Sequence, residues 1–381
     1  MAIVAAWQTG KIVHREVAMR EILHNFPAGQ ALPAGLESLV LAGALDVDMD
    51  VRESALEILQ NRRDPALIAM AVAQLHDCDP QTCQLGLNYL KYADANIGVP
   101  AVIPFLDKDN PLLVATALKL LEHWAGQKFD VKLADTVPVE NKNTGLLEYS
   151  EDSQTKAKNG AQLAKSWWLQ HQTNFPPVHL EVSSAAFAAL KPEPAADFSL
   201  CTLDGQRVRL ADLRGKVVLI TFWTTWCTAC VSEMPELIAL QKQHAGQLVV
   251  MGVSLDFVPD EDGDDSSKMS ADEHHTDESS QTAFTKIHEK IARTIKARGI
   301  NYTILLDENN DVGGRFNGGE LPTTVIVDAN GNIRRRFIGP RSLPVFEAMI
   351  AEACLPAPHV SVNEMIHAGQ GDSSQSVSWA H

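Results

Sequence analysis

The fold of the C-terminal half is decided by the stretch Val217-Val-Leu-Ile-Thr-Phe-Trp-Thr-Thr-Trp-Cys-Thr-Ala-Cys230. Its first six residues are all apolar or β-branched, which is typical of a strand that is buried on both faces. After Cys227 the apolar side chains recur at helical spacing. They are Cys230, Met234, Leu237, Ile238 and Leu240. The sequence therefore predicts a strand that runs into a helix, with Cys227 and Cys230 at the junction.

Two cysteines at such a junction are suited to thiol–disulfide exchange. We expect Cys227 at the helix N-terminus, where unpaired N–H groups and the positive end of the helix dipole stabilise a thiolate. Cys230, one turn later, is expected to face inward, close enough to form a disulfide with Cys227 and to resolve a mixed disulfide. Because the pair itself carries the redox change, the sequence predicts no cofactor.

The same residues resemble a known family. Trp226-Cys-Thr-Ala-Cys230, followed by Pro235, is similar to the thioredoxin-like fold, in which that proline kinks the active-site helix. Glu233-Met-Pro235 resembles the TlpA-like branch of this fold, the extracytoplasmic thiol–disulfide oxidoreductases that include cytochrome c maturation proteins. Further stretches that match the family lie between residues 190 and 353: Asp197-Phe-Ser-Leu200, Asp204-Gly-Gln206, Leu213-Arg-Gly-Lys-Val217, Leu321-Pro-Thr-Thr-Val-Ile-Val-Asp328, Asp328-Ala-Asn-Gly-Asn-Ile333 and Phe337-Ile-Gly339.

The resemblance implies a role for each side chain of the site. Cys227 would be the attacking thiolate, Cys230 the resolving thiol, and Glu233 the group that tunes both cysteines. A cis bond before Pro322 would lay backbone across the dithiol and present groups with which a substrate strand can pair. The residues expected beside the dithiol are Trp226, Thr228, Ala229 and Leu321.

Two of these assignments have simpler alternatives. The buried acid of cytoplasmic thioredoxins falls at Thr221, which cannot ionise, so acid–base assistance to Cys230 is expected from Glu233. The alternative for Glu233 is a solvated side chain near a helix N-terminus, which is favourable by itself. The alternative for Pro322 is an ordinary proline of a loop.

The resemblance implies an enzyme that reduces or exchanges protein disulfides and receives electrons from an upstream thiol reductant. A peroxidase of the peroxiredoxin kind is a second candidate, since Thr224 stands three residues before Cys227, but Ile220 occupies the place of the expected proline. A third candidate is an interaction scaffold whose redox domain is vestigial. A zinc site needs two further ligands at the usual spacing, and a copper chaperone needs a longer cysteine spacing; the sequence has neither.

Composition narrows the range of partners. The 381 residues are 45% hydrophobic and 21% charged, as in ordinary globular proteins, and this length suits two or three domains. A net charge of −16 argues against nucleic acids and anionic membranes as partners, and no apolar run is long enough to span a membrane. The N-terminus lacks the pattern of a signal peptide. The resemblance nevertheless implies an extracytoplasmic location, periplasmic or in the cell envelope, and a cytoplasmic location stays open.

The first third of the chain repeats with a period of 31 residues. The corresponding positions are Leu56, Leu87 and Leu118; Ala55, Gly86 and Ala117; and the expected helix caps Asp48, Asp79 and Asn110. Antiparallel helix pairs that repeat in this way stack into an α-solenoid, which offers a surface for a protein partner. Asp50-Val-Arg-Glu-Ser-Ala-Leu56 resembles HEAT repeats. Because few residues precede the first repeat, we expect the natural start to lie upstream of Met1.

The fold class is therefore an α-solenoid followed by a thioredoxin-like α/β domain. The predicted segments are a HEAT-like α-solenoid (1–130), a connecting segment with one Trp-rich helix (131–188), a thioredoxin-like redox domain (189–355) and a disordered tail (356–381). The Trp-rich helix is expected over Thr155–Gln170, with Trp167 and Trp168 packed against the end of the solenoid.

An acidic insertion, residues 256–280, contains ten acids and one base. Strands 217–222 and 248–254 are joined by a helix, so we expect them to be parallel and to end at the same edge of the sheet. The insertion would then begin at the edge that carries the dithiol, where its charge attracts basic partners. The alternative is a solvated loop. The pairing of the other cysteines stays open: Cys78, Cys83, Cys201 and Cys354.

Overall fold

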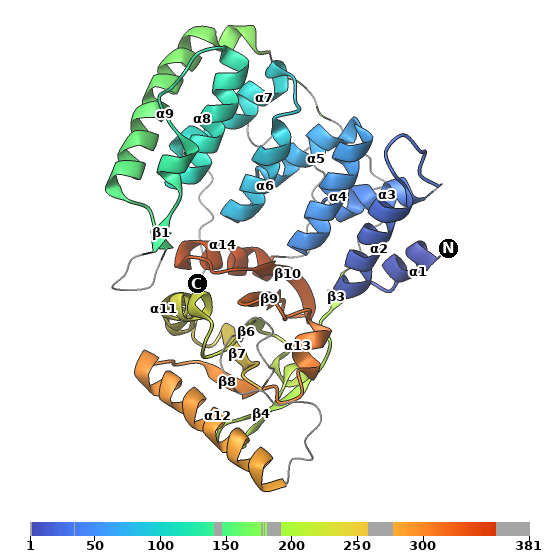
Figure 1. The fold of residues 1–381 in the computed structure, drawn as a ribbon, viewed down its shortest axis with the longest axis vertical. Coiled ribbons are helices and arrows are strands. Elements are labelled where there is room, and N and C mark those ends of the chain that lie inside the picture. The colour runs from blue at the N-terminus through green and yellow to red at the C-terminus, as the bar shows by residue number, and fades with distance from the viewer. Residues whose placement is uncertain are drawn as a thin grey trace. The chain divides into compact units, whose positions relative to one another are not determined.

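Figure 1 shows the computed structural model of the chain, in which residues 2–33, 35–140, 147–176, 178, 180, 192–257 and 277–355 are described. The chain divides into two units, with the boundary between Lys191 and Pro192. Most of the acidic insertion (258–276), the end of the connecting segment with the first residues of the predicted redox domain (181–191), and the whole C-terminal tail (356–381) lie outside the described residues. What the sequence predicts for them stays a prediction.

The first unit is helical, as the sequence predicts. Its helices are α1 (Ala2–Gln8), α2 (Ile12–Asn25), α3 (Leu36–Gly43), α4 (Met49–Arg62), α5 (Ala66–Gln74), α6 (Pro80–Leu90), α7 (Ala95–Val102), η1 (Ile103–Asp107), α8 (Pro111–Ala125), η2 (Leu133–Thr136), α9 (Glu151–His171) and η3 (Gln172–Asn174), with a small hairpin of β1 (Val139–Glu140) and β2 (Leu147–Glu148). Within each 31-residue period two helices pair, α3 with α4, α5 with α6 and α7 with α8, and α4, α6 and α8 contact one another in succession. This arrangement is compatible with the predicted solenoid, whose HEAT-like class stays a prediction.

The helix caps that the repeat predicts are present. The side chain of Asp48 accepts the N–H groups of Asp50 and Val51 at the start of α4. Asp79 accepts the N–H of Gln81 at the start of α6, and Asn110 accepts two N–H groups at the start of α8. Each cap satisfies a backbone donor that the first turn of a helix leaves without an intrahelical partner, so the repeat fixes where these helices begin.

Gly86 shows why the repeat keeps a small residue at this position. A Cβ atom at Gly86 would lie 2.7 Å from the carbonyl oxygen of Ala71 and 2.9 Å from Cβ of Gln74, both on α5. Ala55 and Ala117, which correspond to Gly86, are fully buried. A larger side chain at this position would therefore force the two helices of a pair apart.

The Gly86→Ala variant is expected to be less stable than the native protein. Alanine is better than glycine inside a helix by about 1 kcal/mol, but overpacking against backbone costs about 1–3 kcal/mol, so the clash outweighs the gain. Urea denaturation followed by far-UV circular dichroism measures the difference. The matched control is Asn88→Ala on the exposed face of the same helix, which should be at least as stable as the native protein. Equal stability of the two variants would contradict the close contact of α5 and α6.

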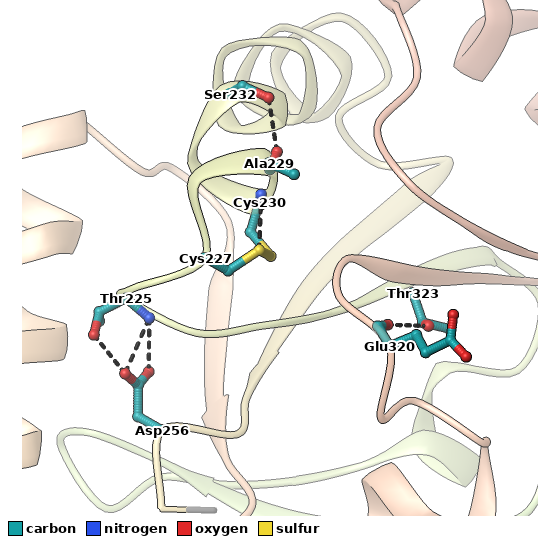
Figure 2. The surroundings of a disulfide bond; sticks show 8 residues. All are labelled: Thr225, Cys227, Ala229, Cys230, Ser232, Asp256, Glu320 and Thr323. Carbon is teal, nitrogen blue, oxygen red and sulfur yellow. Dashed lines mark hydrogen bonds between the residues drawn. A yellow bond between two sulfur atoms is a disulfide. The ribbon is translucent and has the colours of Figure 1, made fainter. Parts of the chain in front are cut away.

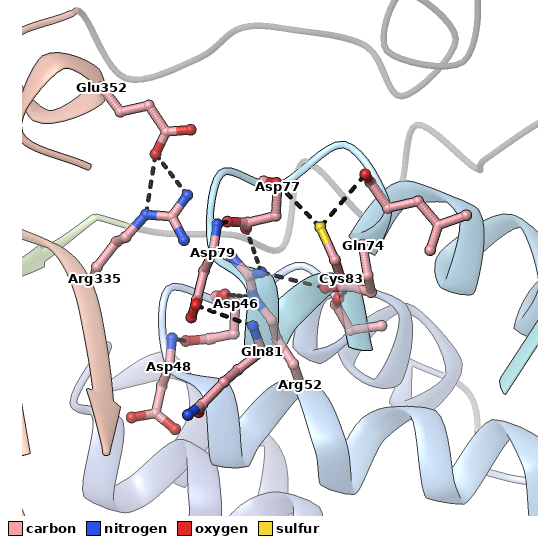
Figure 3. A network of polar contacts seen from close by, with 12 residues as sticks. Asp46, Asp48, Arg52, Gln74, Asp77, Asp79, Gln81, Cys83, Arg335 and Glu352 are labelled. Atoms are coloured by element: carbon pink, nitrogen blue, oxygen red, sulfur yellow. Dashed lines mark hydrogen bonds and ion pairs between the residues drawn. The ribbon is translucent and has the colours of Figure 1, made fainter. Parts of the chain in front are cut away.

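Buried polar contacts connect successive repeats of the first unit (Figure 3). Arg52 donates to the carboxylate of Asp77 at 2.9 Å and to Gln74 Oε1 at 3.2 Å, and Gln74 Nε2 donates to the carbonyl oxygen of Ala44 at 2.7 Å. The thiol of Cys83 lies 3.2 Å from the carbonyl oxygen of Asp77. Neither Cys83 nor Cys78 belongs to a disulfide in the structure, so the local pairing that their spacing left open is not formed.

The Trp-rich helix is α9, which extends the expected range at both ends. It packs against α8 and η1, and its buried alanines belong to the hydrophobic core of these helices. Trp167 and Trp168 are partly buried against that core, and Trp167 meets Phe129 edge to face, with the ring centroids 6.4 Å apart. Both tryptophans therefore pack as the sequence predicts.

The second unit is built on an eight-stranded sheet with the order β3-β10-β9-β6-β7-β8-β4-β5. The strands are β3 (Glu193–Pro194), β4 (Ser199–Thr202), β5 (Arg207–Arg209), β6 (Val217–Trp223), β7 (Leu248–Ser254), β8 (Thr303–Leu306), β9 (Thr323–Val327) and β10 (Asn332–Ile338). The helices are η4 (Leu210–Leu213), α11 (Thr228–Gln243), α12 (Asp277–Arg298), α13 (Asp311–Arg315) and α14 (Leu343–Cys354). None of the helices in the described ranges combines the length and the hydropathy that a membrane crossing requires.

Strand β6 lies in the middle of the sheet, and all seven of its residues are buried. It pairs in parallel with β7, with Trp223 opposite Ser254, and antiparallel with β9, with Phe222 opposite Thr323. The predicted parallel pairing is therefore confirmed. Helices α11 and α14 pack against each other and onto these central strands, so the helix that follows β6 starts at the edge of the sheet where β6 and β7 end and β9 begins.

Candidate active site

The dithiol lies where β6 turns into α11. The turn is closed by the N–H of Cys227, which donates to the carbonyl oxygen of Thr224 at 3.4 Å. Cys227 is the N-cap of α11, and its Sγ accepts the N–H of Cys230 at 3.1 Å. The two cysteines form a disulfide, with their Cα atoms 5.3 Å apart (Figure 2). The strand–helix junction thus places both sulfurs at the helix N-terminus.

The sulfurs are buried beneath a more exposed rim. Cys227 is 8% exposed and Cys230 is 3% exposed, so the first is the more accessible of the two. Trp226 is 44% exposed, Thr228 is exposed and Ala229 is half-buried. Solvent therefore reaches the rim more than either cysteine.

The loop before β9 lies beside the end of β6. Phe222 and Thr323 are opposite each other in the antiparallel pairing, so Pro322 is next to the point where the chain leaves β6 for the cysteines. The Leu321–Pro322 bond is cis, and the carbonyl oxygen of Pro322 accepts the N–H of Gly339 at 2.8 Å. In Figure 2 the loop that carries Glu320 and Thr323 lies across from the disulfide.

Glu233 is buried, with 1% of its surface exposed, so the alternative of a solvated glutamate is wrong. It lies on α11 one turn after Cys230, and its Oε1 accepts the backbone N–H of Arg341 at 2.9 Å. Burial raises the pKa of Glu233 to about 8, although the N–H and the charge of Arg341 act in the opposite direction. Burial, and then the charge of Glu233, raise the pKa of Tyr302.

Arg341 belongs to a segment that connects Glu233 with the proline loop. Its guanidinium donates to the carbonyl oxygens of Ile338 and Gly339, both at 3.1 Å, and lies 4.5 Å from the ring centroid of Phe337. The N–H of Gly339 in turn donates to Pro322. The side chain of Arg341 therefore fixes the segment that binds Glu233 on one side and the proline loop on the other.

Sequence reasoning missed Asp256 and Arg341 as parts of the site. Asp256 belongs by composition to the acidic insertion, yet its carboxylate accepts the backbone N–H of Thr225, two residues before Cys227. The signal that could have found it is the parallel register, because Thr225 and Asp256 each follow the last paired residue of their strand by two positions. For Arg341 the sequence carries no comparable signal, since the hydrogen bond to Glu233 comes from its backbone N–H.

Among the described residues, one group of three His, Cys, Asp or Glu side chains has ligand atoms close enough to one another to hold a metal ion. It consists of Glu16, Asp48 and Asp50 in the first unit. It contains neither Cys227 nor Cys230, so within the described ranges no third ligand joins the two sulfurs in the way that a zinc or copper site requires.

Comparisons with known proteins agree with this geometry. The profile of the AhpC/TSA family matches residues 192–336. The thioredoxin-like protein YneN of Bacillus subtilis (strain 168) is 31% identical over 147 residues, which are 39% of this chain and 71% of YneN. The thiol–disulfide oxidoreductase ResA of Geobacillus kaustophilus (strain HTA426) is 30% identical over 148 residues, which are 38% of this chain and 67% of ResA. The chain belongs to the thioredoxin-like thiol–disulfide oxidoreductases.

A solved structure of a similar protein is also known. A thioredoxin-like protein from Neisseria meningitidis is 27% identical, with a TM-score of 0.33, and the match covers 43% of this chain and 91% of that one. The profile and the two relatives each match less than half of this chain, and the profile match lies within the second unit. The family assignment therefore rests on the second unit.

The buried Glu233 predicts a pH dependence of stability. Because its pKa is about 8 in the folded protein, against an ordinary value of 4.5, the folded protein keeps a proton that the unfolded chain loses over this interval. Stability should therefore fall as the pH rises from about 4.5 to about 8. The Glu233→Gln variant lacks this titration, so its free energy of unfolding relative to the native protein should rise with pH by on the order of a few kcal/mol.

Guanidinium denaturation at pH 5 and pH 9 measures this difference. The control is Glu236→Gln on the same helix, where the half-buried carboxylate accepts the N–H of Leu343 at 3.2 Å. A stability difference for Glu233→Gln that is the same at both pH values would contradict the raised pKa.

Proposed function

We propose that this protein reduces or exchanges disulfides of other proteins with the pair Cys227 and Cys230. The observation that carries the proposal is the position of both sulfurs at the N-terminus of α11, where Sγ of Cys227 accepts the N–H of Cys230. The same N–H and the helix dipole would stabilise a thiolate at Cys227 after reduction. The names of the relatives YneN and ResA support a dithiol exchange function.

The reaction consists of two thiolate–disulfide exchanges. The thiolate of Cys227 attacks one sulfur of the substrate disulfide, the substrate S–S bond breaks, and its other sulfur leaves as a thiolate. Cys230 then loses its proton and attacks Sγ of Cys227, which breaks the mixed disulfide and releases the second substrate thiolate. The substrate gains two electrons and the pair becomes the Cys227–Cys230 disulfide. An upstream dithiol reductant returns the two electrons by the same steps in reverse.

The difference in exposure supports this division of roles. Cys227 is the more exposed residue of the pair and Cys230 the more buried, so we assign the first contact with an external disulfide to Cys227. Glu233 follows Cys230 by one turn and, with a pKa of about 8, holds a proton for the most part at neutral pH. In its ionised form, which is the minor one at neutral pH, it can accept the proton that the Cys230 thiol loses when Cys230 becomes a nucleophile.

The loop at Pro322 is the proposed contact for the substrate chain. Leu321 is half-buried, and the carbonyl oxygen of Pro322 is already bound to Gly339, so the backbone of Leu321 is the part of the loop that we assign to the substrate. A strand of the substrate would pair with it as an added β-strand. Trp226, exposed beside the cysteines, provides an apolar contact for the same substrate segment.

The two units would divide recognition and chemistry between them. In the first unit, side chains of α4, α6 and α8 line a hollow of about 420 Å³. Glu53, Tyr89 and Lys119 are among these side chains, and we assign this surface to a protein partner.

The resemblance of Glu233-Met-Pro235 to the TlpA-like branch supports an extracytoplasmic location. No observation favours the peroxidase or the vestigial scaffold over dithiol exchange.

Replacement of single cysteines tests the assigned roles. Cys227→Ser should abolish reduction of a protein disulfide such as that of insulin, because the attacking sulfur is gone. Cys230→Ser should accumulate mixed disulfides, because the resolving thiol is gone. Non-reducing electrophoresis and mass spectrometry of the Cys227 peptide detect the trapped species. The control is Cys354→Ser, an exposed free cysteine on α14, which should turn over like the native protein. Normal turnover by Cys230→Ser would refute the assignment.

A further inference from the structure

The turn that precedes Cys227 is held by the carboxylate of Asp256, a residue just after the neighbouring strand β7 (Figure 2). The two oxygens of Asp256 lie 3.0 and 3.2 Å from the backbone nitrogen of Thr225, which donates its N–H to them. The hydroxyl of Thr225 donates to the same carboxylate. Thr225 is the second residue of the turn from Thr224 to Cys227, so Asp256 binds this turn through both polar donors of one residue.

The carboxylate of Asp256 is itself fixed at the end of β7. The hydroxyl of Ser254 donates to its Oδ2 at 2.8 Å, and Ser254 is fully buried in the strand. The parallel pairing continues one residue past the strands, where the N–H of Leu255 donates to the carbonyl oxygen of Trp223 at 2.9 Å. Beyond this point the chain after β6 turns toward α11, and the next N–H that bonds across to β7, that of Thr225, donates to the side chain of Asp256 and not to a backbone carbonyl.

The turn also has a closing hydrogen bond of its own. This bond, from the N–H of Cys227 to Thr224, is long at 3.4 Å, whereas the contact of Asp256 with Thr225 is charge-assisted and joins two oxygens to two donors. Cys227 follows Thr225 by two residues and begins α11. Movement of the turn would therefore move the sulfur away from the N–H groups that stabilise its thiolate.

We propose that Asp256 is a positioning residue of the dithiol, whose carboxylate fixes the turn before Cys227 and thereby sets the rate at which the Cys227 thiolate reacts. The proposal rests on the proposed function, because it takes Cys227 as the attacking sulfur. Asp256 acts through Thr225 and takes part in no bond-making step.

The test compares Asp256→Ala with Asp256→Asn in the full chain. Both variants remove the same negative charge, but asparagine keeps an oxygen that can accept the N–H of Thr225. The ratio of their rates therefore reports the position of the turn and not the charge. The reduced proteins are alkylated with iodoacetamide at pH 7, and mass spectrometry follows modification of the peptide that contains Cys227. We expect Asp256→Ala to react about tenfold more slowly than Asp256→Asn, as for the loss of one hydrogen bond between neutral groups.

The control for a loss of stability is Asp328→Ala. Asp328 also follows a strand of this sheet and accepts the N–H groups of Asn330 and Asn332, but these contacts belong to the turn between β9 and β10. This variant should lower the melting temperature and leave the alkylation rate of Cys227 unchanged. In the Thr225→Val background, where one of the two donors is missing, the rate difference between Asp256→Ala and Asp256→Asn should shrink.

Equal rates for Asp256→Ala and Asp256→Asn would overturn the proposal, as would an equal slowing by Asp328→Ala. Failure of the proposed function has a different signature. It would be seen in the native protein, as a Cys227 that reacts no faster than the exposed Cys354, and it would overturn both proposals together.

Discussion

The parallel pairing of β6 with β7 is the constraint on which the site depends. Seven buried residues place β6 at the centre of the sheet, and the register that sets Trp223 opposite Ser254 determines which residues meet beyond the strand ends. Both chains leave the sheet at the same edge, so the turn that carries Cys227 emerges beside Asp256. Cys227 is the N-cap of the helix that follows this turn, so both sulfurs lie at the N-terminus of this helix.

A second constraint is the burial of Glu233. A carboxyl group that is almost fully shielded from water is costly to ionise, and the N–H of Arg341 compensates only part of this cost. The same segment that supplies this N–H also supplies the N–H of Gly339 to Pro322. The ionisation of Glu233 and the position of the proline loop therefore depend on one short segment between β10 and α14.

The sequence predicts the parts of this structure that are set by local pattern. The buried run of β6, the caps at Asp48, Asp79 and Asn110 and the parallel course of β6 and β7 all follow from residue type and spacing. Contacts between distant segments carry no such pattern. The hydrogen bond from residue 341 to Glu233 comes from a backbone N–H, which no residue type marks in the sequence, and Asp256 is one acid among ten in a stretch whose composition is typical of a solvated loop. For this reason the sequence identifies the cysteines but not the groups that hold them.

The most direct measurement of the central claim is a redox titration of the Cys227–Cys230 pair. The native chain is equilibrated with defined ratios of reduced to oxidised glutathione, quenched with acid and alkylated, and the peptides that contain the two cysteines are quantified by mass spectrometry. The account predicts one reversible transition in which both thiols appear and disappear together, as a two-electron couple requires. Cysteines that stay oxidised at every ratio, or that change independently of each other, would contradict it.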